Sequence, residues 1–154
     1  MGLFRAAAAT AGIVLLPALL LVSHPAIADD ETIGSVKNVF GSCSVVRDGQ
    51  RMPARPGLKL HAGDTLETGT DGRFGVALRD DTLLSLGPSS SLAVEKFLFV
   101  PAEGKLGLTA RILRGTMAYV SGLIGRLAPE STTFVTPVAT IGVRGTHFAV
   151  KVSE

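Results

Sequence analysis

The chain has 154 residues, which is enough for one domain and short for two. Hydrophobic residues make up 46% of the sequence, which excludes a disordered chain and predicts a packed core. The formal net charge is only +2 and the basic residues are scattered singly, so we do not expect binding to nucleic acid.

The first 28 residues have the features of a secretory signal peptide. Arg5 supplies an early positive charge, an apolar run covers residues 13–22, and Ala26-Ile27-Ala28 forms a cleavage site. An uncleaved membrane anchor is the alternative, but the apolar run is shorter than the roughly 20 residues that span a bilayer. We therefore expect a signal-peptide helix in residues 1–28, one mature domain in residues 29–154, a periplasmic location, and no stable membrane span after cleavage.

Cys43 is the only cysteine, so the chain cannot form a disulfide within itself. A domain of this size does not need one to fold. Residues 41–46 favour a strand, so we favour burial of Cys43 as a small apolar residue over a reactive thiol, and the sequence alone does not decide a redox role.

Short strands separated by polar turns are expected throughout the first part of the mature domain. The expected strands are residues 33–40, 43–46, 58–60 and 65–68. The expected turns and loops are Asp48-Gly49, residues 51–57, Gly63-Asp64 and residues 69–72, because glycine, proline and aspartate favour turns.

Apolar residues then alternate strictly along the chain, which indicates strands with one buried face. The residues expected to point inward are Phe74, Val76, Leu78, Thr82, Leu84, Leu86, Leu92 and Val94. Asp80-Asp81 and residues 87–91 are the turns between these runs, and a change of face is expected after Lys96.

The middle of the domain is less regular. A loop is expected at residues 101–107, a strand at 108–113 and a turn at Arg114-Gly115. Met117 and Tyr119, or their neighbours Ala118 and Val120, then point inward. Residues 122–131 fit either one helical turn or an exposed loop.

Residues 133–152 carry further strands and a glycine corner. Residues 134–136 favour a strand that Pro137 ends, and residues 140–143 form a second extended run. Arg144-Gly145 indicates a turn or bulge, because glycine adopts the positive φ that other residues avoid. Residues 146–152 alternate as a half-buried strand does.

Strands recur at intervals of about 8–12 residues, and no helical stripe of useful length follows residue 28. The fold class predicted from this spacing is all-β, with many short strands in a sandwich, a barrel or a rolled, solenoid-like sheet.

Several short motifs together resemble the FecR domain. The resemblance covers about residues 35–152, and its most specific block is Thr136-Pro137-x-Ala139-x-x-Gly142-Val143-Arg144-Gly145-Thr146-x-Phe148. The resemblance implies an all-β, rolled, solenoid-like fold and a role in bacterial envelope sensing. The motif residues that it singles out are Gly63, Asp64, Thr68, Gly69, Asp80, Asp81, Thr136, Pro137, Arg144, Gly145, Thr146 and Phe148.

The best-known members of that family are inner-membrane regulators. They carry a signal from a siderophore-loaded outer-membrane transporter to a cytoplasmic sigma factor. This sequence lacks their cytoplasmic N-terminal region and ends two residues after Val152. We therefore do not expect direct control of a sigma factor, and what the resemblance implies is the exported sensing or binding module.

Enzymatic and metal chemistry have little support in the sequence. His61 and His147 are the only histidines after the leader, and no serine lies in a nucleophile-elbow context. His147 is expected to face solvent. The candidate metal ligands Asp64, Asp71, Asp80 and Asp81 stand in turn contexts and fit no calcium or zinc spacing. We expect no catalytic residues, no metal and no cofactor.

Arg144 is the charged residue of most interest. A guanidinium beside a glycine turn can brace a carboxylate through paired hydrogen bonds. We favour that structural role, with Asp64 or Asp81 as the partner, over recognition of a ligand.

A binding function fits the sequence best, with another envelope protein as the partner. The candidate contacts are Phe97, Phe99 and Val100, whose apolar run exceeds what one buried face explains. The alternative is that Phe97 and Phe99 join the core beside Phe74 and Phe148. A cell-wall glycan or peptidoglycan is the second candidate partner, and a small hydrolase is a weaker alternative from another class.

Overall fold

The computed structural model describes residue 2 and residues 31–153. The predicted signal peptide therefore lies, but for residue 2, outside the described residues. Within the part that is described, no helix has the length and apolar character needed to cross a membrane.

The described chain is built almost entirely from strands. They are β1 (Thr32–Phe40), β2 (Cys43–Arg47), β3 (Gln50–Pro53), β4 (Lys59–His61), β5 (Thr65–Thr68), β6 (Arg73–Leu78), β7 (Leu83–Leu86), β8 (Ser91–Val100), β9 (Lys105–Val120), β10 (Thr132–Val135), β11 (Thr140–Gly142) and β12 (His147–Val152). Three short helical turns accompany them: η1 (Pro101–Glu103), α1 (Leu123–Leu127) and η2 (Pro129–Ser131).

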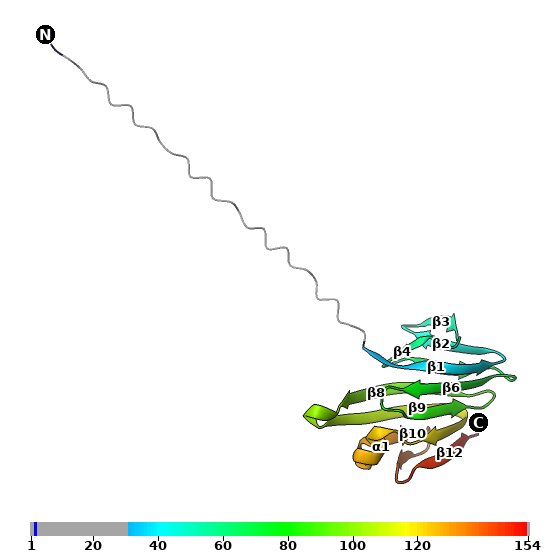
Figure 1. The fold of residues 1–154 in the computed structure, drawn as a ribbon. Coiled ribbons are helices and arrows are strands. Elements are labelled where there is room, and N and C mark those ends of the chain that lie inside the picture. Colours follow the sequence, from blue (N-terminus) through cyan, green and yellow to red (C-terminus); the bar gives the residue numbers. More distant parts are fainter. Residues whose placement is uncertain (1, 3–30, 154) are drawn as a thin grey trace.

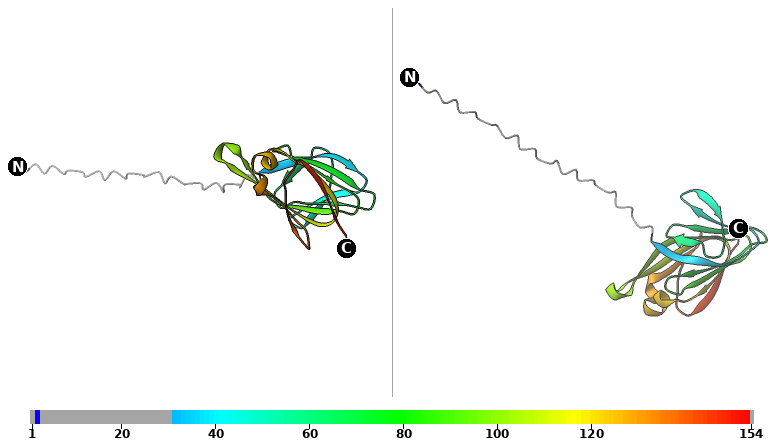
Figure 2. Two further views of the ribbon diagram at one scale, coloured as in Figure 1. Left: turned by 90° about the horizontal axis from the view of Figure 1, so that it is seen from below. Right: turned by 45° about the horizontal axis from the view of Figure 1, so that its top comes forward.

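These twelve strands form one sheet that curls round on itself, as Figures 1 and 2 show. Its main path runs β3-β2-β5-β8-β9-β7-β6-β1-β4, and β10, β11 and β12 lie off this path. The first half of β9 pairs with β8 and β10, and its second half pairs with β7 and β12. The long strand β9 thus belongs to both layers of the rolled sheet, and the all-β prediction is confirmed.

β9 changes layer at Gly115, where the sequence predicted a turn. Ser91 faces Arg114 whereas Leu92 faces Ile112, so one extra residue is inserted and the strand bulges. Gly115 has a φ of 84°, which favours glycine. The predicted turn is wrong: the positive φ is real, but the chain continues as the same strand.

One hydrophobic core fills the space between the layers. The residues predicted to point inward on β6 and β7 are buried, as are Leu92, Val94, Met117 and Tyr119. The rings of Tyr119, Phe134 and Phe148 form a triangle in which each pair of centroids is 5.1 Å apart. This aromatic triangle ties β9, β10 and β12 together at the C-terminal end of the core.

Two predicted loops contain strand residues. The Asp48-Gly49 turn, with φ values of 50° and 77°, closes a hairpin whose second strand is β3, so residues 51–53 are paired with β2. Pro53 is tolerated because β3 is the edge of the sheet and needs no further donor. Residues 105–107 likewise begin β9. The undecided stretch 122–131 forms helical turns, as one of its two readings expected.

Candidate functional site

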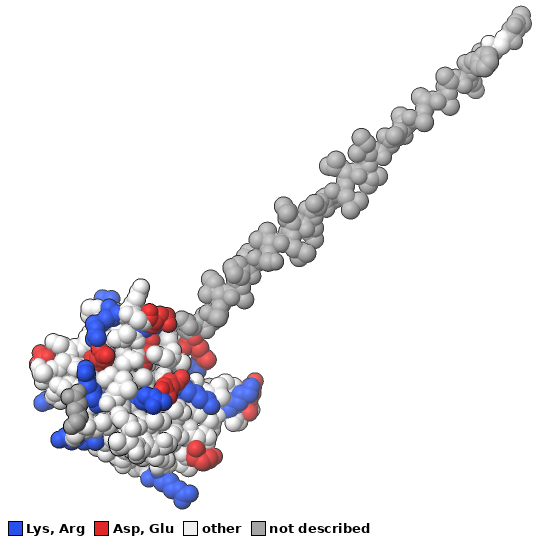
Figure 3. Space-filling model, turned by 180° about the vertical axis from the view of Figure 1, so that it is seen from behind, with Lys and Arg blue, Asp and Glu red and all other residues white. Residues whose placement is uncertain are grey.

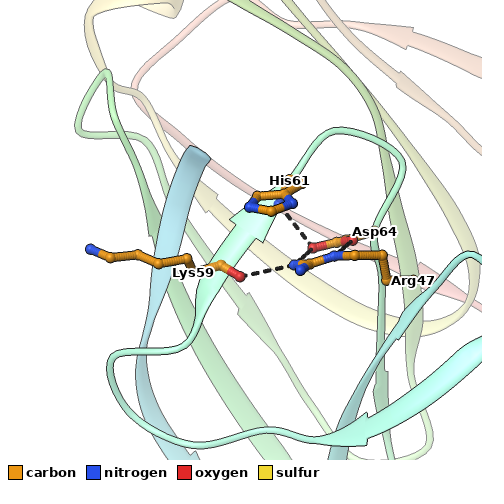
Figure 4. Close-up of polar contacts among 4 residues, drawn as sticks. All are labelled: Arg47, Lys59, His61 and Asp64. Atoms are coloured by element: carbon orange, nitrogen blue, oxygen red, sulfur yellow. Dashed lines mark hydrogen bonds and ion pairs between the residues drawn. The ribbon is translucent and has the colours of Figure 1, made fainter. Parts of the chain in front are cut away.

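Asp64 of the Gly63-Asp64 motif forms a buried ion pair with Arg47 (Figure 4). Arg47 Nε donates to Asp64 Oδ1 at 2.8 Å, and Arg47 Nη2 donates to Oδ2 at 2.7 Å. The backbone N–H of His61 also donates to Oδ2, and Arg47 Nη2 reaches the carbonyl of Lys59. Asp64 is only 1% exposed, so this motif residue holds β2, β4 and the following turn together.

Asp80 of the Asp80-Asp81 motif anchors the helical turn α1. Its carboxylate accepts hydrogen bonds from the N–H and hydroxyl of Thr82 and from the N–H of Ile124, at 2.8–3.1 Å. Its carbonyl accepts the N–H of Leu123. Asp80 is fully buried, whereas Asp81 is exposed and takes the left-handed conformation of the turn with a φ of 67°. Asp80 therefore fixes α1 against the β6–β7 turn.

Two hydroxyl groups organise the remaining turns of the family-like motifs. Thr68 Oγ1 donates to the carbonyl of Gly87 at 2.7 Å and accepts the N–H of Ser90 at 2.8 Å. Thr136 Oγ1 accepts the N–H of Ala139 at 3.0 Å, and the N–H of Thr136 donates to the carbonyl of Ala139. The motif residue Gly69 lies in the turn between β5 and β6, and Pro137 lies in the turn of the β10–β11 hairpin. The motif residues Thr68, Gly69, Thr136 and Pro137 therefore have a structural role in the turns.

Arg144 does not brace Asp64 or Asp81. Arg47 takes the Asp64 carboxylate instead, and no ion pair or hydrogen bond joins the Arg144 guanidinium to any described residue. Arg144 lies instead at the exposed corner between β11 and β12. Sequence reasoning missed Arg47, which no motif distinguishes from the other scattered arginines.

The corner around Arg144 forms one wall of a cleft of about 740 Å³, which we call the arginine cleft. Residues 142–146 make this wall, and Ser121, Gly125, Arg126, Pro129 and Glu130 make the other. Arg126 is held in place by a hydrogen bond from its Nη2 to the carbonyl of Ser121 at 3.3 Å. The N–H of Ser121 donates to the carbonyl of Thr146, which joins the two walls.

Gly145 and Phe148 behave as the sequence predicted. Gly145 has a φ of 130°, and Phe148 is half-buried in the aromatic triangle. Thr146 is exposed, and its hydroxyl lies 3.1 Å from Nδ1 of His147, which faces solvent on β12 as expected.

The hairpin that joins β8 to β9 carries the candidate partner contacts (Figure 1). Phe97, Leu98, Phe99 and Val100 are all partly exposed, as is Leu106 opposite them. A bulge between Val94 and Lys96 produces the change of face that the sequence predicted. The rings of Phe97 and Phe99 pack on one another at 6.3 Å and against the edge of the core, apart from the aromatic triangle that contains Phe148.

Two titratable side chains near the β1–β2 corner have shifted pKa values. Burial raises the pKa of the Cys43 thiol, and its Sγ donates hydrogen bonds to the carbonyls of Arg73 and Phe40. The N–H of Ser42 donates to Asp71 Oδ1 at 3.2 Å and lowers the pKa of that carboxyl group. Cys43 is half-buried, less than the sequence predicted, because it begins β2 beside the corner.

Charged side chains are mixed in sign over the face drawn in Figure 3, where basic and acidic residues alternate. Within residues 31–153, no group of three or more His, Cys, Asp and Glu side chains is placed to hold a metal ion.

The family model described as FecR protein matches residues 64–154, which is more than half of the chain. Comparison with curated proteins found no match, and comparison with solved structures also found none. The matched region contains nearly all of the motif residues that carry the resemblance, from Asp64 to Phe148. The chain is a member of the FecR protein family.

Proposed function

We propose that this protein is a non-enzymatic sensing and interaction module, which is exported to the periplasm and binds another envelope protein during signal transduction. Membership of the FecR family supports this proposal, because it is a regulatory family of the bacterial envelope. Most of the family motif residues stabilise turns, so the binding surface that we propose lies elsewhere on the molecule.

The observation that carries the proposal is the apolar β8–β9 hairpin. Successive side chains of a strand point to opposite faces, so Phe97 and Phe99 share one face while Leu98 and Val100 share the other. Both faces are partly exposed to solvent. Only Phe97 and Phe99 pack against the core, and Leu98 and Val100 do not belong to it. A ribbon with apolar side chains on both faces gains stability when a partner covers it.

The hairpin is also placed to reach a partner. It extends beyond the rest of the rolled sheet in Figure 1, and η1 forms its tip. Val100 pairs with Lys105 and Phe99 pairs with Leu106, so backbone hydrogen bonds hold the ribbon in shape up to that tip. A rigid, protruding apolar element loses little conformational entropy on binding.

A photo-crosslinking amino acid at Val100 tests the proposal in whole cells. We expect an adduct of one defined mass with an inner- or outer-membrane protein, and we expect Leu98→Asp to abolish it. The same crosslinker at Gln50, an exposed residue on a different hairpin, is the matched control. An equal yield of the same adduct from Gln50, or no adduct from Val100, would contradict the proposed function.

The proposed export has its own test. We expect the protein recovered from the periplasmic fraction to begin at Asp29, which N-terminal sequencing or intact mass measures. A full-length protein in the cytoplasmic fraction would contradict the proposed location.

A further inference from the structure

We propose that the arginine cleft binds the C-terminal carboxylate of an extended segment of a partner protein, and that this segment adds to the free edge of β12. The inference rests on the proposed function in one respect, since the ligand belongs to a partner protein. It concerns a different surface from the β8–β9 hairpin.

The first support is the charge of the cleft. Arg144 and Arg126 stand on its two walls, and Glu130 is the acidic residue that lines it, so the side chains that line the cleft carry a net charge of +1. The Arg144 guanidinium has no ion pair or hydrogen bond with a described residue, and neither has the Glu130 carboxylate. A planar guanidinium with free donors matches the two oxygens of a carboxylate.

The second support is the backbone of the corner. The N–H groups of Arg144, Gly145 and Thr146 donate no hydrogen bond to any described residue. Successive free N–H groups at a glycine turn form a site for an anionic oxygen, and proteins capture terminal carboxylates in such turns. Gly145, with its positive φ, gives the turn its shape.

The third support is a buried polar group behind the cleft. Tyr119 is 1% exposed, and its hydroxyl has no hydrogen-bond partner among the described residues. It lies directly against Gly125, since a Cβ added to that glycine would overlap the hydroxyl. Buried hydroxyl groups nearly always have a partner, and this unpaired one lies behind Gly125, which lines the cleft where Tyr119 itself does not.

The strand that follows the corner gives the orientation of the ligand. β12 pairs with β9 along one edge, and no described strand pairs with its other edge, which lies at the rim of the molecule in Figure 1. Extended peptides add to such edges through main-chain hydrogen bonds. The cleft is at the start of β12, so a segment whose carboxylate sits in the cleft runs antiparallel to β12.

An NMR titration of the mature protein tests the proposal. The probe is a peptide of alternating threonine and valine with a free C-terminal carboxylate, and the matched probe is the same peptide with a C-terminal amide. We expect the carboxylate peptide at millimolar concentration to shift the amide signals of Arg144, Gly145, Thr146 and β12, and the amide peptide to bind about tenfold more weakly.

Two cleft variants sharpen the test. Arg144→Gln should weaken binding of the carboxylate peptide about tenfold, whereas Arg55→Gln, at an exposed arginine elsewhere, should leave it unchanged. Glu130→Gln should strengthen binding, because it removes the negative charge that repels the ligand.

Several outcomes would overturn the inference. They are equal binding of the two peptides, wild-type affinity in Arg144→Gln, shifts confined to other parts of the protein, or equal shifts caused by acetate or phosphate alone. Failure here is distinguishable from failure of the proposed function, because Leu98→Asp removes the hairpin contact and leaves the cleft intact.

Discussion

Ser90 and Thr116 exchange two hydrogen bonds at the point where β9 passes from one layer of the sheet to the other. The Ser90 hydroxyl donates to the carbonyl of Thr116 at 3.1 Å and accepts its N–H at 2.9 Å. A side chain thus supplies the pairing that the backbone loses at the bulge. The residue before Thr116 is Gly115, and a Cβ at that position would overlap the backbone and hydroxyl of Ser90.

Replacement of Gly115 by alanine should therefore destabilise the whole domain. The added Cβ meets Ser90, and a φ of 84° is strained for alanine, so we expect a loss of about 3 kcal/mol in the free energy of unfolding. Gly104→Ala is the control, because Gly104 also has a positive φ but has open space around it. Urea denaturation measures both, and equal losses would show that contact with Ser90 does not matter.

Loss of Arg47 should leave a buried charge at Asp64. We expect Arg47→Met to lower the free energy of unfolding by about 3 kcal/mol, the lower end of the range for a broken buried pair, since Arg47 is 24% exposed. Arg51→Met, which breaks the more exposed pair with Glu67, should cost less than about 1 kcal/mol.

A double variant separates the buried charge from simple packing. Arg47→Met combined with Asp64→Asn should be more stable than Arg47→Met alone, because the amide of asparagine carries no charge and still accepts the N–H of His61. A double variant less stable than Arg47→Met would show that lost packing, and not the buried charge, causes the loss of stability in Arg47→Met.

These relationships explain how far the sequence could predict the structure. The alternation in β6 and β7 is local, and it placed Phe74, Val76 and Leu84 in the core correctly. The partner of Asp64 is not local: Arg47 lies 17 positions away, and any of the scattered basic residues was a candidate. The sequence predicts a turn at Gly115, next to the bulge, for the same reason, since Ser90, which maintains the pairing there, is distant in sequence.

The arginine cleft illustrates the same limit. Sequence reasoning recognised Arg144-Gly145 as a corner but gave its guanidinium a carboxylate partner within the chain. Arg126 and Ser121 complete the cleft. Arg126 belongs to the stretch 122–131, whose conformation the sequence left undecided, and Ser121 directly precedes that stretch. Asp80 decides that conformation through contacts more than 40 positions away.

Asp80→Ala should release α1 from the β6–β7 turn. The change leaves the buried N–H groups of Thr82 and Ile124 unpaired, so we expect a loss of about 3 kcal/mol in stability. Amide hydrogen exchange at Leu123 and Ile124 should become faster than in the wild-type protein. Asp81→Asn is the control, since asparagine tolerates the left-handed conformation and Asp81 is exposed. Unchanged exchange at Ile124 in Asp80→Ala would contradict the anchoring role.

Cys43 should react slowly with thiol reagents. Burial raises the pKa of its thiol, so the fraction present as the reactive thiolate at neutral pH is smaller than for a free cysteine. A comparison with Ala62→Cys in a Cys43→Ala background provides an exposed thiol on the same domain. We expect about tenfold slower reaction of Cys43 with a disulfide reagent. Equal rates at the two positions would indicate an accessible, activated thiol and would reopen a redox role.

Asp71 should make the stability of the domain depend on pH in the acid range. The N–H of Ser42 holds the carboxylate and lowers the pKa of Asp71 in the folded state below its ordinary value of 3.8. A group whose folded pKa is lowered contributes stability above its unfolded pKa, and that contribution is lost as the pH falls through the folded pKa. Wild-type protein should therefore lose more stability between neutral pH and pH values below 3.8 than Asp71→Asn does. Urea midpoints measured across that range check this, with Asp48→Asn as a control at another exposed turn aspartate. Parallel pH profiles for wild type and Asp71→Asn would show that the Ser42 contact contributes nothing in solution.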